Sequence, residues 1–154
     1  MTTPLSTGVS GDHQAVAAVE EQFRLIFTRA RAALREHAER IHPALQPVGY
    51  KIVDMLARRG PLHAREVAEY LAIDKSLVSR TVKQLEELGL VSRRSDPDDG
   101  RACFLEVTHA TRQRVAEVRA ADQRLLQERM AEWSPGQVVL LAELLEKLNE
   151  TFQT

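Results

Sequence analysis

The sequence predicts a mainly α-helical protein with a small β-hairpin, in which a compact segment of two short helices lies between much longer ones. Residues 62–91 contain two short helical patterns, LHAREVAEYLAI and DKSLVSRTVKQLEELGLV. They are followed by SRRSDPDDGRACFLEVT, two strand-like segments around a turn rich in Asp, Pro and Gly. Both flanks have the apolar periodicity of long helices. Helix, turn, helix and hairpin in this order are the pattern of a winged helix-turn-helix.

Composition places the chain among ordinary globular proteins. Its 154 residues are 44% hydrophobic and 28% charged, enough for one domain with a sizeable core. No apolar run approaches the length of a membrane span, and the polar start lacks the signature of a signal peptide, so we expect a cytoplasmic protein. A single cysteine, Cys103, excludes an intramolecular disulfide and a multi-cysteine zinc site.

The N-terminal flank is expected to be a flexible polar arm, residues 1–12, followed by a long helix over residues 13–41. The helical stretch has no proline or glycine, and its apolar residues recur at spacings of three and four along two stripes. A helix with two apolar faces needs two partners, and a second subunit is an economical source of one. His42-Pro43 ends the helix because proline disfavours helical geometry in the residue before it.

The central segment begins with a shorter helix, residues 46–58, that Gly60-Pro61 stops. Leu62 is expected to form a minimal strand, and His63 to cap the next helix. Asp74 is expected to accept backbone hydrogen bonds at the start of a helix that runs to Leu88. Gly89 then ends that helix as a C′ residue.

The hairpin and the C-terminal flank follow. Strands are expected at residues 90–94 and 102–107, joined by a turn over residues 95–100. Thr108 is a suitable cap for a helix of about 25 residues ending near Trp133. Ser134-Pro135 supplies a cap and a first-turn proline for a last helix. The expected organisation is therefore an arm (1–12), a helical dimerisation region (13–45 and 108–154) and a winged helix-turn-helix DNA-binding domain (46–107).

The net charge of the chain says little about DNA binding, but the distribution of charged residues around the predicted helix 74–88 does. The net charge is −1, and between Asp74 and Arg101 six basic residues cancel six acidic ones. On the predicted helix 74–88 the basic and hydroxyl groups fall opposite the apolar side, whereas Glu86 and Glu87 lie in the last turn. These groups are Lys75, Ser76, Ser79, Arg80 and Lys83.

With these residues in place, the chain resembles the MarR type of transcriptional regulator. The resemblance is carried by LHAREVAEYLAIDKSLVSRTVKQLEELGLVSRR, by the wing motif DPDDGR with Asp99 and Arg101, and by the exit LEVT into a long helix. It implies an obligate homodimer whose first, fifth and sixth helices intertwine. It also implies a repressor, less often an activator, that leaves a pseudo-palindromic operator when it meets a small, often phenolic, ligand or an oxidant. Many relatives have a second basic residue where this chain has Gly100, so the contact of the wing with the minor groove should depend on Arg101 alone.

The predicted DNA-binding residues belong to two elements. The helix 74–88 should enter the major groove, where Arg is the best bidentate reader of guanine; the alternative is a solvated helix surface. Arg101 should enter the minor groove, held in position by a charge-assisted hydrogen bond that it donates to Asp99. Arg93 and Arg94 alternate faces, so one is expected to meet phosphate and the other to pair with an acid of the wing. The full set is Lys75, Ser76, Ser79, Arg80, Lys83, Arg93, Arg94, Asp99 and Arg101.

Other functions have weaker support. There is no Gly-rich phosphate loop and no nucleophile with a base at recognisable spacing, so we expect no enzyme, catalytic residue or cofactor. Five histidines raise a metal-sensor alternative, but they lack a nearby ligand cluster, so no metal site is expected. Cys103 allows an oxidant-responsive regulator, although a small buried hydrophobe explains it better. A winged helix used only for protein contacts is a further alternative, and an effector cleft is expected near Phe27, His37, Tyr50 and Met55.

Overall fold

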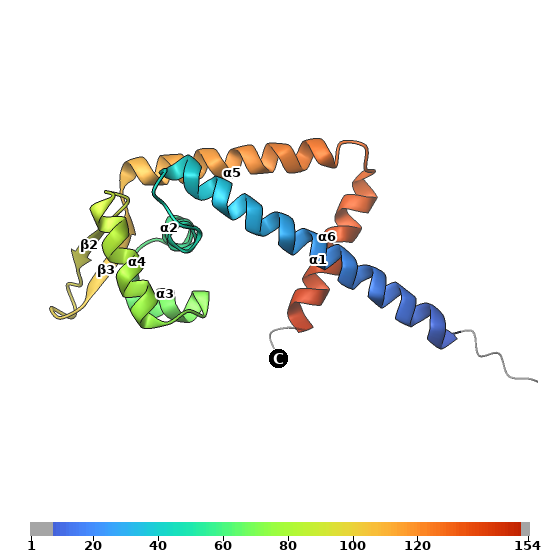
Figure 1. The fold of residues 1–154 in the computed structure, drawn as a ribbon, viewed down its shortest axis with the longest axis horizontal. Coiled ribbons are helices and arrows are strands. Elements are labelled where there is room, and N and C mark those ends of the chain that lie inside the picture. Colours follow the sequence, from blue (N-terminus) through green and yellow to red (C-terminus); the bar gives the residue numbers. More distant parts are fainter. Residues whose placement is uncertain (1–7, 152–154) are drawn as a thin grey trace, which may run out of the picture. The chain divides into compact units, whose positions relative to one another are not determined.

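The computed structural model describes residues 8–151, with side chains from residue 12 onward, and confirms the predicted fold class. Contacts divide the chain into two compact units, residues 1–115 and 116–154. The elements in chain order are α1 (Gly8–Ile41), α2 (Pro47–Arg59), β1 (Leu62–His63), α3 (Ala64–Leu71), α4 (Lys75–Glu87), β2 (Val91–Ser95), β3 (Cys103–Val107), α5 (His109–Arg129) and α6 (Pro135–Thr151) (Figure 1).

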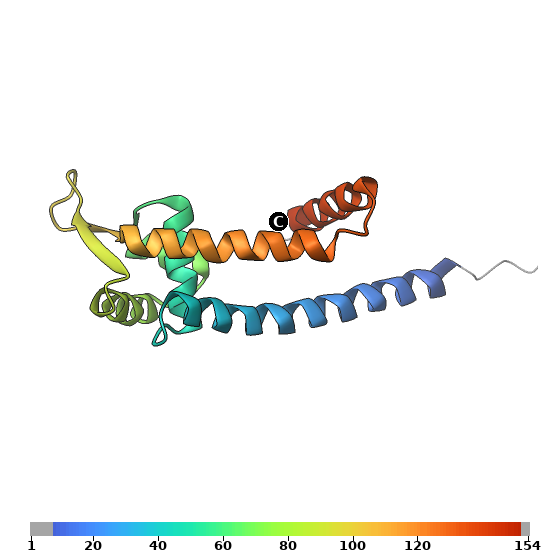
Figure 2. The ribbon, with the colours of Figure 1, turned by 90° about the horizontal axis from the view of Figure 1, so that it is seen from above.

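Helix α1 begins earlier than predicted. Residues 1–7 of the expected arm lie outside the described residues, and residues 8–12 are helical. The sequence has no proline between Pro4 and Pro43, so the two glycines near the start weaken the helix without stopping it. In Figures 1 and 2 the N-terminal half of α1 extends beyond α2, α3, α4 and the three strands.

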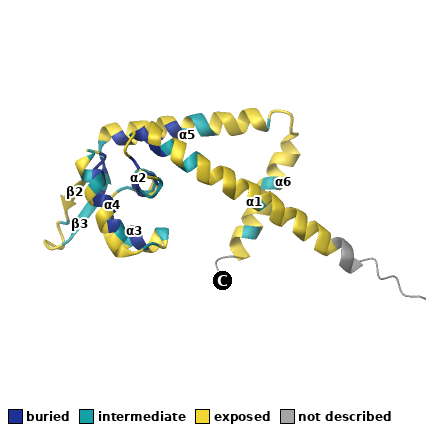
Figure 3. Ribbon diagram, viewed as in Figure 1, coloured by how far each residue is buried: buried dark blue, intermediate teal, exposed yellow. Residues whose placement is uncertain are grey.

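The core of the first unit lies where α2, α3 and α4 meet the sheet. Ile52, Val53 and Leu56 of α2 are fully buried, as are Val78 and Leu85 of α4 (Figure 3). Each such side chain stabilises the fold by about 1.5–3 kcal/mol through the apolar surface it removes from water. The C-terminal end of α1 joins this core through Ala38 and Ile41, and the first turns of α5 join it through Thr111 and Val115.

The sheet has three antiparallel strands in the order β1-β3-β2. The minimal strand expected at Leu62 is present and pairs with β3, and the hairpin strands β2 and β3 agree with the predicted ranges to within one residue at each end. In this register Arg93 faces Leu105 and Arg94 faces Phe104. Consecutive residues of a strand point to opposite faces, so the two arginines lie on different sides of the wing.

Local chemistry ends most elements where the sequence predicted. Gly89 has a φ of 68° and follows α4, and the N–H of Leu90 donates to the carbonyl oxygen of Leu85 at 2.9 Å, as in a Schellman motif. The Ser134 hydroxyl caps α6 at the N–H of Gln137. Helix α5 is shorter than expected, since it ends at Arg129 rather than near Trp133.

Thr108 ties three elements together. Its N–H donates to the carbonyl oxygen of Leu90 at 3.1 Å, and its hydroxyl donates to the carbonyl oxygen of Gly89 at 3.2 Å. The same hydroxyl oxygen lies 3.4 Å from the N–H of Thr111 in the first turn of α5. The end of α4, the start of β2 and the start of α5 therefore share one hydrogen-bonded junction.

Candidate nucleic-acid interface

Helix α4 presents one apolar and one polar face. Val78, Thr81, Val82 and Leu85 are buried and recur at helical spacing, which fixes the rotation of the helix. The opposite face is exposed along its N-terminal half. The exposed side chains there are those predicted to contact DNA: Lys75, Ser76, Ser79, Arg80 and Lys83.

This exposed face of α4 has unused hydrogen-bonding capacity. Among the side chains described from residue 12 to residue 151, Arg80 and Lys83 form no ion pair, and Ser76 and Ser79 form no hydrogen bond. Cations and hydroxyls in this state remain available for phosphate oxygens and base edges. We therefore take this half of α4 as the centre of the candidate interface.

The start of α4 differs from the prediction in one contact. Asp74 is the N-cap residue, with φ −63° and ψ 140°, but its carboxylate accepts no capping hydrogen bond. The side chain is exposed to solvent. Its negative charge still lies beside the positive end of the helix dipole, which remains favourable without a direct bond.

The acidic end of α4 is partly neutralised by the wing. The Arg93 Nε donates to a Glu86 carboxylate oxygen at 2.8 Å. This bond, with a weaker contribution from the Cys103 sulfur 3.7 Å from Nη1, raises the pKa of the Arg93 guanidinium above its ordinary value. Glu86 is thus paired, and the charge that remains on the front half of α4 is positive.

Arg94 lies on the other face of the wing and is also engaged. Its Nε is 3.5 Å from a Glu106 carboxylate oxygen, and its guanidinium carbon lies 5.3 Å from the centre of the Phe104 ring. Pairing of one arginine with an acid of the wing agrees with the prediction. Arg93, the other arginine, contacts an acid of α4, and the expected contact of one arginine with phosphate stays a prediction. Both would have to share or exchange these partners to reach a phosphate.

The wing turn shows a different role for Asp99 from the one predicted. Its carboxylate accepts a hydrogen bond from the backbone N–H of Arg101 at 3.0 Å, and its carbonyl oxygen accepts one from the N–H of Ala102 at 2.9 Å. In a turn this tight the backbone N–H two residues on is the nearest donor, as in an Asx turn. Asp99 therefore shapes the turn and does not hold the Arg101 guanidinium, which is exposed and, among the described side chains, unpaired.

His63 contributes to the wing in a way that the sequence did not indicate. Its backbone N–H donates to Glu66 at 2.7 Å, in agreement with the predicted cap of α3. Its ring lies between the two ends of the hairpin turn, with Nε2 3.1 Å from Asp96 Oδ2 and Nδ1 3.1 Å from the Cys103 carbonyl oxygen. The ring also stacks on Phe104, with centroids 4.2 Å apart. These contacts depend on the pairing of β1 with β3, strands some 40 residues apart, which no local pattern encodes.

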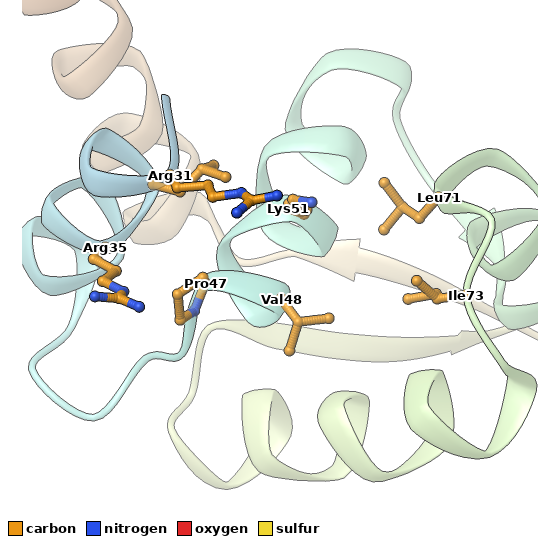
Figure 4. A pocket seen from close by; sticks show the side chains of 8 residues that line it. Arg31, Arg35, Pro47, Val48, Lys51, Leu71 and Ile73 are labelled. Atoms are coloured by element: carbon orange, nitrogen blue, oxygen red, sulfur yellow. The ribbon is translucent and has the colours of Figure 1, made fainter. Parts of the chain in front are cut away.

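A depression elsewhere in the first unit combines cations with apolar side chains. It has a volume of about 340 Å³, and α1, α2 and the α3–α4 connection all contribute to it. Arg31 and Arg35 reach toward it from α1 and Lys51 from α2 (Figure 4). The four residues expected near an effector cleft do not line it; two of them, His37 and Tyr50, contact each other with ring centroids 5.4 Å apart. The apolar lining comprises Leu34, Pro47, Val48, Leu71 and Ile73.

Two absences among the described residues bear on the alternatives. No group of three or more His, Cys, Asp or Glu side chains between residues 12 and 151 is arranged to hold a metal ion. No helix in the described part of the chain is long and apolar enough to cross a membrane. Cys103 is half-buried on β3 beside Arg93.

Comparison with known proteins gives one consistent family. Residues 45–102 match the model of the MarR family. The HTH-type transcriptional regulator YxaD of Bacillus subtilis is 32% identical over 126 residues, which cover 79% of this chain and 85% of the relative. A putative transcriptional regulatory protein for the hcr operon of Thauera aromatica is 30% identical over 76% of this chain and 72% of its own length. A MarR family protein from Bacillus stearothermophilus has a similar fold, with a TM-score of 0.79 at 22% identity over 92% of this chain and 98% of the other. Both relatives are named as transcriptional regulators, in agreement with the expectation that this chain is a regulator and not an enzyme.

Proposed function

Because this chain belongs to the MarR family of transcription regulators, we propose that it is a homodimeric repressor that binds a pseudo-palindromic operator and leaves it when a small molecule binds. The DNA-binding part of this proposal rests on the basic and hydroxyl side chains of α4, which have no partner among the side chains of residues 12–151. We propose that its N-terminal half enters the major groove, with Arg80 reading a base and Lys75 and Lys83 contacting phosphates.

The wing supplies the second contact in this proposal. Arg101 stands at the tip of the hairpin on a turn that Asp99 keeps in shape, and it enters the adjacent minor groove. Arg93 and Arg94 lie at the base of the hairpin, where they exchange part of their contact with Glu86 and Glu106 for backbone phosphates. A protein of this kind acts on chromosomal DNA and is therefore cytoplasmic.

Large exposed hydrophobic side chains support dimerisation. On α1, Val16, Val19, Ile26 and Phe27 are between 51% and 60% exposed. A monomer that left so much apolar surface on long helices in water would be prone to association. A second copy covers such surface with the same residues, as a two-fold axis requires. The corresponding side chains of α6 include Val139, Leu140, Leu144 and Leu145.

A selection experiment tests the DNA-binding proposal. Random genomic fragments are incubated with the full-length protein, and the bound fragments are sequenced. We expect a shared sequence with two related halves whose centres lie about 34–36 Å apart, one turn of DNA, because each subunit presents one α4. Failure to enrich any sequence, with the folded protein confirmed by circular dichroism, would favour the protein-interaction alternative. Transcript levels of the genes beside the enriched sites, compared with and without the protein, then tell repressor from activator.

The effector is proposed to be a small aromatic acid in the depression between α1 and α2. Its apolar lining suits a ring, and Lys51, Arg31 and Arg35 suit a carboxylate. Lys51→Met keeps the stem and removes the charge, so hydroxybenzoate binding measured by calorimetry should weaken about tenfold, as for the loss of one charge-assisted hydrogen bond. Operator affinity without ligand should not change.

Two controls accompany this measurement. Lys147→Met removes an exposed lysine on α6, outside the depression, and should leave hydroxybenzoate binding unchanged. Equal binding by wild type and Lys51→Met would rule the depression out as the effector site. Peroxide added to the operator complex of wild type and of Cys103→Ser separates the oxidant alternative, which requires release in the first protein only.

A further inference from the structure

We propose that His63 is a positioning residue that holds the wing in its DNA-binding conformation only while the imidazole carries a positive charge, so that operator affinity falls as pH rises. The effect on affinity rests on the proposed DNA-binding function. The underlying contact between ring and wing does not, and it is testable in the free protein.

The hydrogen-bond geometry carries the inference. Both ring nitrogens of His63 face oxygen atoms that only accept: Nε2 faces the Asp96 carboxylate at 3.1 Å, and Nδ1 faces the Cys103 carbonyl oxygen at 3.1 Å. A neutral imidazole has one N–H, so it donates to one of these oxygens and directs a lone pair at the other. The imidazolium donates to both. The observed conformation is therefore the one that the charged ring satisfies.

The groups around the ring are mostly acidic. Arg65 is paired with Glu69 at 2.8 Å and so does not oppose a positive charge on His63. Arg94 lies over Phe104, the ring on which His63 stacks, and is itself paired with Glu106. Phe104 presents a π face to the imidazole, which favours a cation. Besides His63, the open depression in front of the ring is lined by Arg65, Glu66, Glu69, Asp96, Asp99 and Ala102.

Asp96 transmits the state of the ring to the tip of the wing. While one of its carboxylate oxygens faces His63, the other accepts the N–H of Asp98 at 2.9 Å, and its own N–H donates to Ala102 at 3.1 Å. Asp96 is thus the base of the turn that carries Arg101. When the ring loses its proton, one of the two bonds that join β1 to the ends of the turn is lost, and Arg101 is less firmly placed for the minor groove.

The pH profile of operator affinity is the main test. Fluorescence anisotropy at fixed ionic strength is recorded between pH 5.5 and 8.5, the interval in which imidazoles ordinarily titrate. We expect wild-type affinity to fall by about tenfold or more over this interval, the effect of one hydrogen bond to a charged group. His63→Gln, which cannot change charge, should bind with a nearly flat profile. His13→Gln, an exposed histidine on α1, is the matched control and should retain the wild-type slope.

Asp96→Asn gives a sharper test because it changes which form of the ring fits. The amide oxygen still accepts the N–H of Asp98, while the amide NH2 faces Nε2. A neutral His63 then accepts at Nε2 and donates at Nδ1, so the neutral ring satisfies both neighbours. We expect the pH dependence in this variant to vanish or to reverse. A merely structural role for Asp96 would lower affinity at every pH and leave the slope unchanged, which would contradict the proposal.

A measurement without DNA separates this inference from the proposed function. Long-range proton–nitrogen NMR reports the protonation of both ring nitrogens of His63, and hydrogen exchange reports protection of the Asp98 and Arg101 amides. We expect the two protection factors to fall as the ring loses its second proton. Protection that stays constant through the deprotonation would overturn the inference. If the operator is not bound at any pH, the proposed function is wrong and the link to affinity falls with it, but the ring and exchange data still decide whether His63 holds the wing.

Discussion

Arg80→Ala is expected to weaken operator binding by about 1–3 kcal/mol, roughly five- to 150-fold, and to relax the preference for one base pair in each half-site. Arg80 lies on the exposed face of α4 with no ion pair among the described side chains, so its removal leaves no acid of the protein unpaired. The lost affinity would therefore come from the DNA contact alone. Anisotropy titrations on the selected operator and on single-base variants of it measure both effects.

Two comparisons make the Arg80 result specific. Arg24→Ala removes an exposed arginine of α1 that pairs with Glu21 and should leave affinity unchanged. Arg101→Ala should weaken binding to all sequences alike and reduce the salt dependence of the affinity by about one phosphate contact. If Arg80→Ala lowers affinity equally for every base variant, Arg80 contacts the backbone and does not read a base.

The double variant Leu140→Glu/Leu144→Glu is expected to yield a monomer whose operator affinity is lower by at least about a hundredfold. The two side chains lie one turn apart on α6 and are 53% and 55% exposed. Two carboxylates in an apolar interface would be desolvated without partners, at a cost of several kcal/mol each. A monomer holds one half-site at a time and loses the contacts of the other.

Light scattering with size-exclusion chromatography measures the mass, and circular dichroism verifies that the helices persist. The control is Glu146→Lys/Glu150→Lys, which changes two exposed acidic residues at the same spacing, about 120° around α6 from Leu140 and Leu144. It should remain a dimer. Dimers of both variants would show that this face of α6 does not lie in the subunit interface, and attention would move to the exposed side chains of α1.

The parts of the fold that sequence predicts well are those that local chemistry determines. Gly89 ends α4 because a positive φ costs glycine little, and Ser134 with Pro135 starts α6 because one supplies an acceptor and the other needs no donor. The exposed face of α4 could also be predicted, since the period of a helix fixes which residues lie opposite the buried ones.

Contacts between distant segments could not be predicted in the same way. The pairing of His63 with Phe104 depends on the register of β1 against β3. The engagement of Arg93 by Glu86 depends on how the wing folds back on α4. Asp99 illustrates a finer limit: the sequence placed it correctly beside Arg101, but the backbone N–H and not the guanidinium is the nearer donor in a turn of that size. The sequence thus predicted where these residues lie in the fold, but not which groups they bond to.

The hydrogen-bonded junction at Thr108 couples the orientation of α5 to that of α4. Because Thr108 bonds to the carbonyl oxygens of Gly89 and Leu90 and caps α5, we expect a tilt at the base of α5 to be passed on to the end of α4. A helix of 21 residues is about 30 Å long, so a 5 Å shift at its far end corresponds to a tilt of roughly 10° at its base. In the proposed complex with DNA, such a tilt would alter the angle at which α4 meets the groove. The hydrogen bond from Thr108 to Gly89 lies at the point about which α5 would tilt.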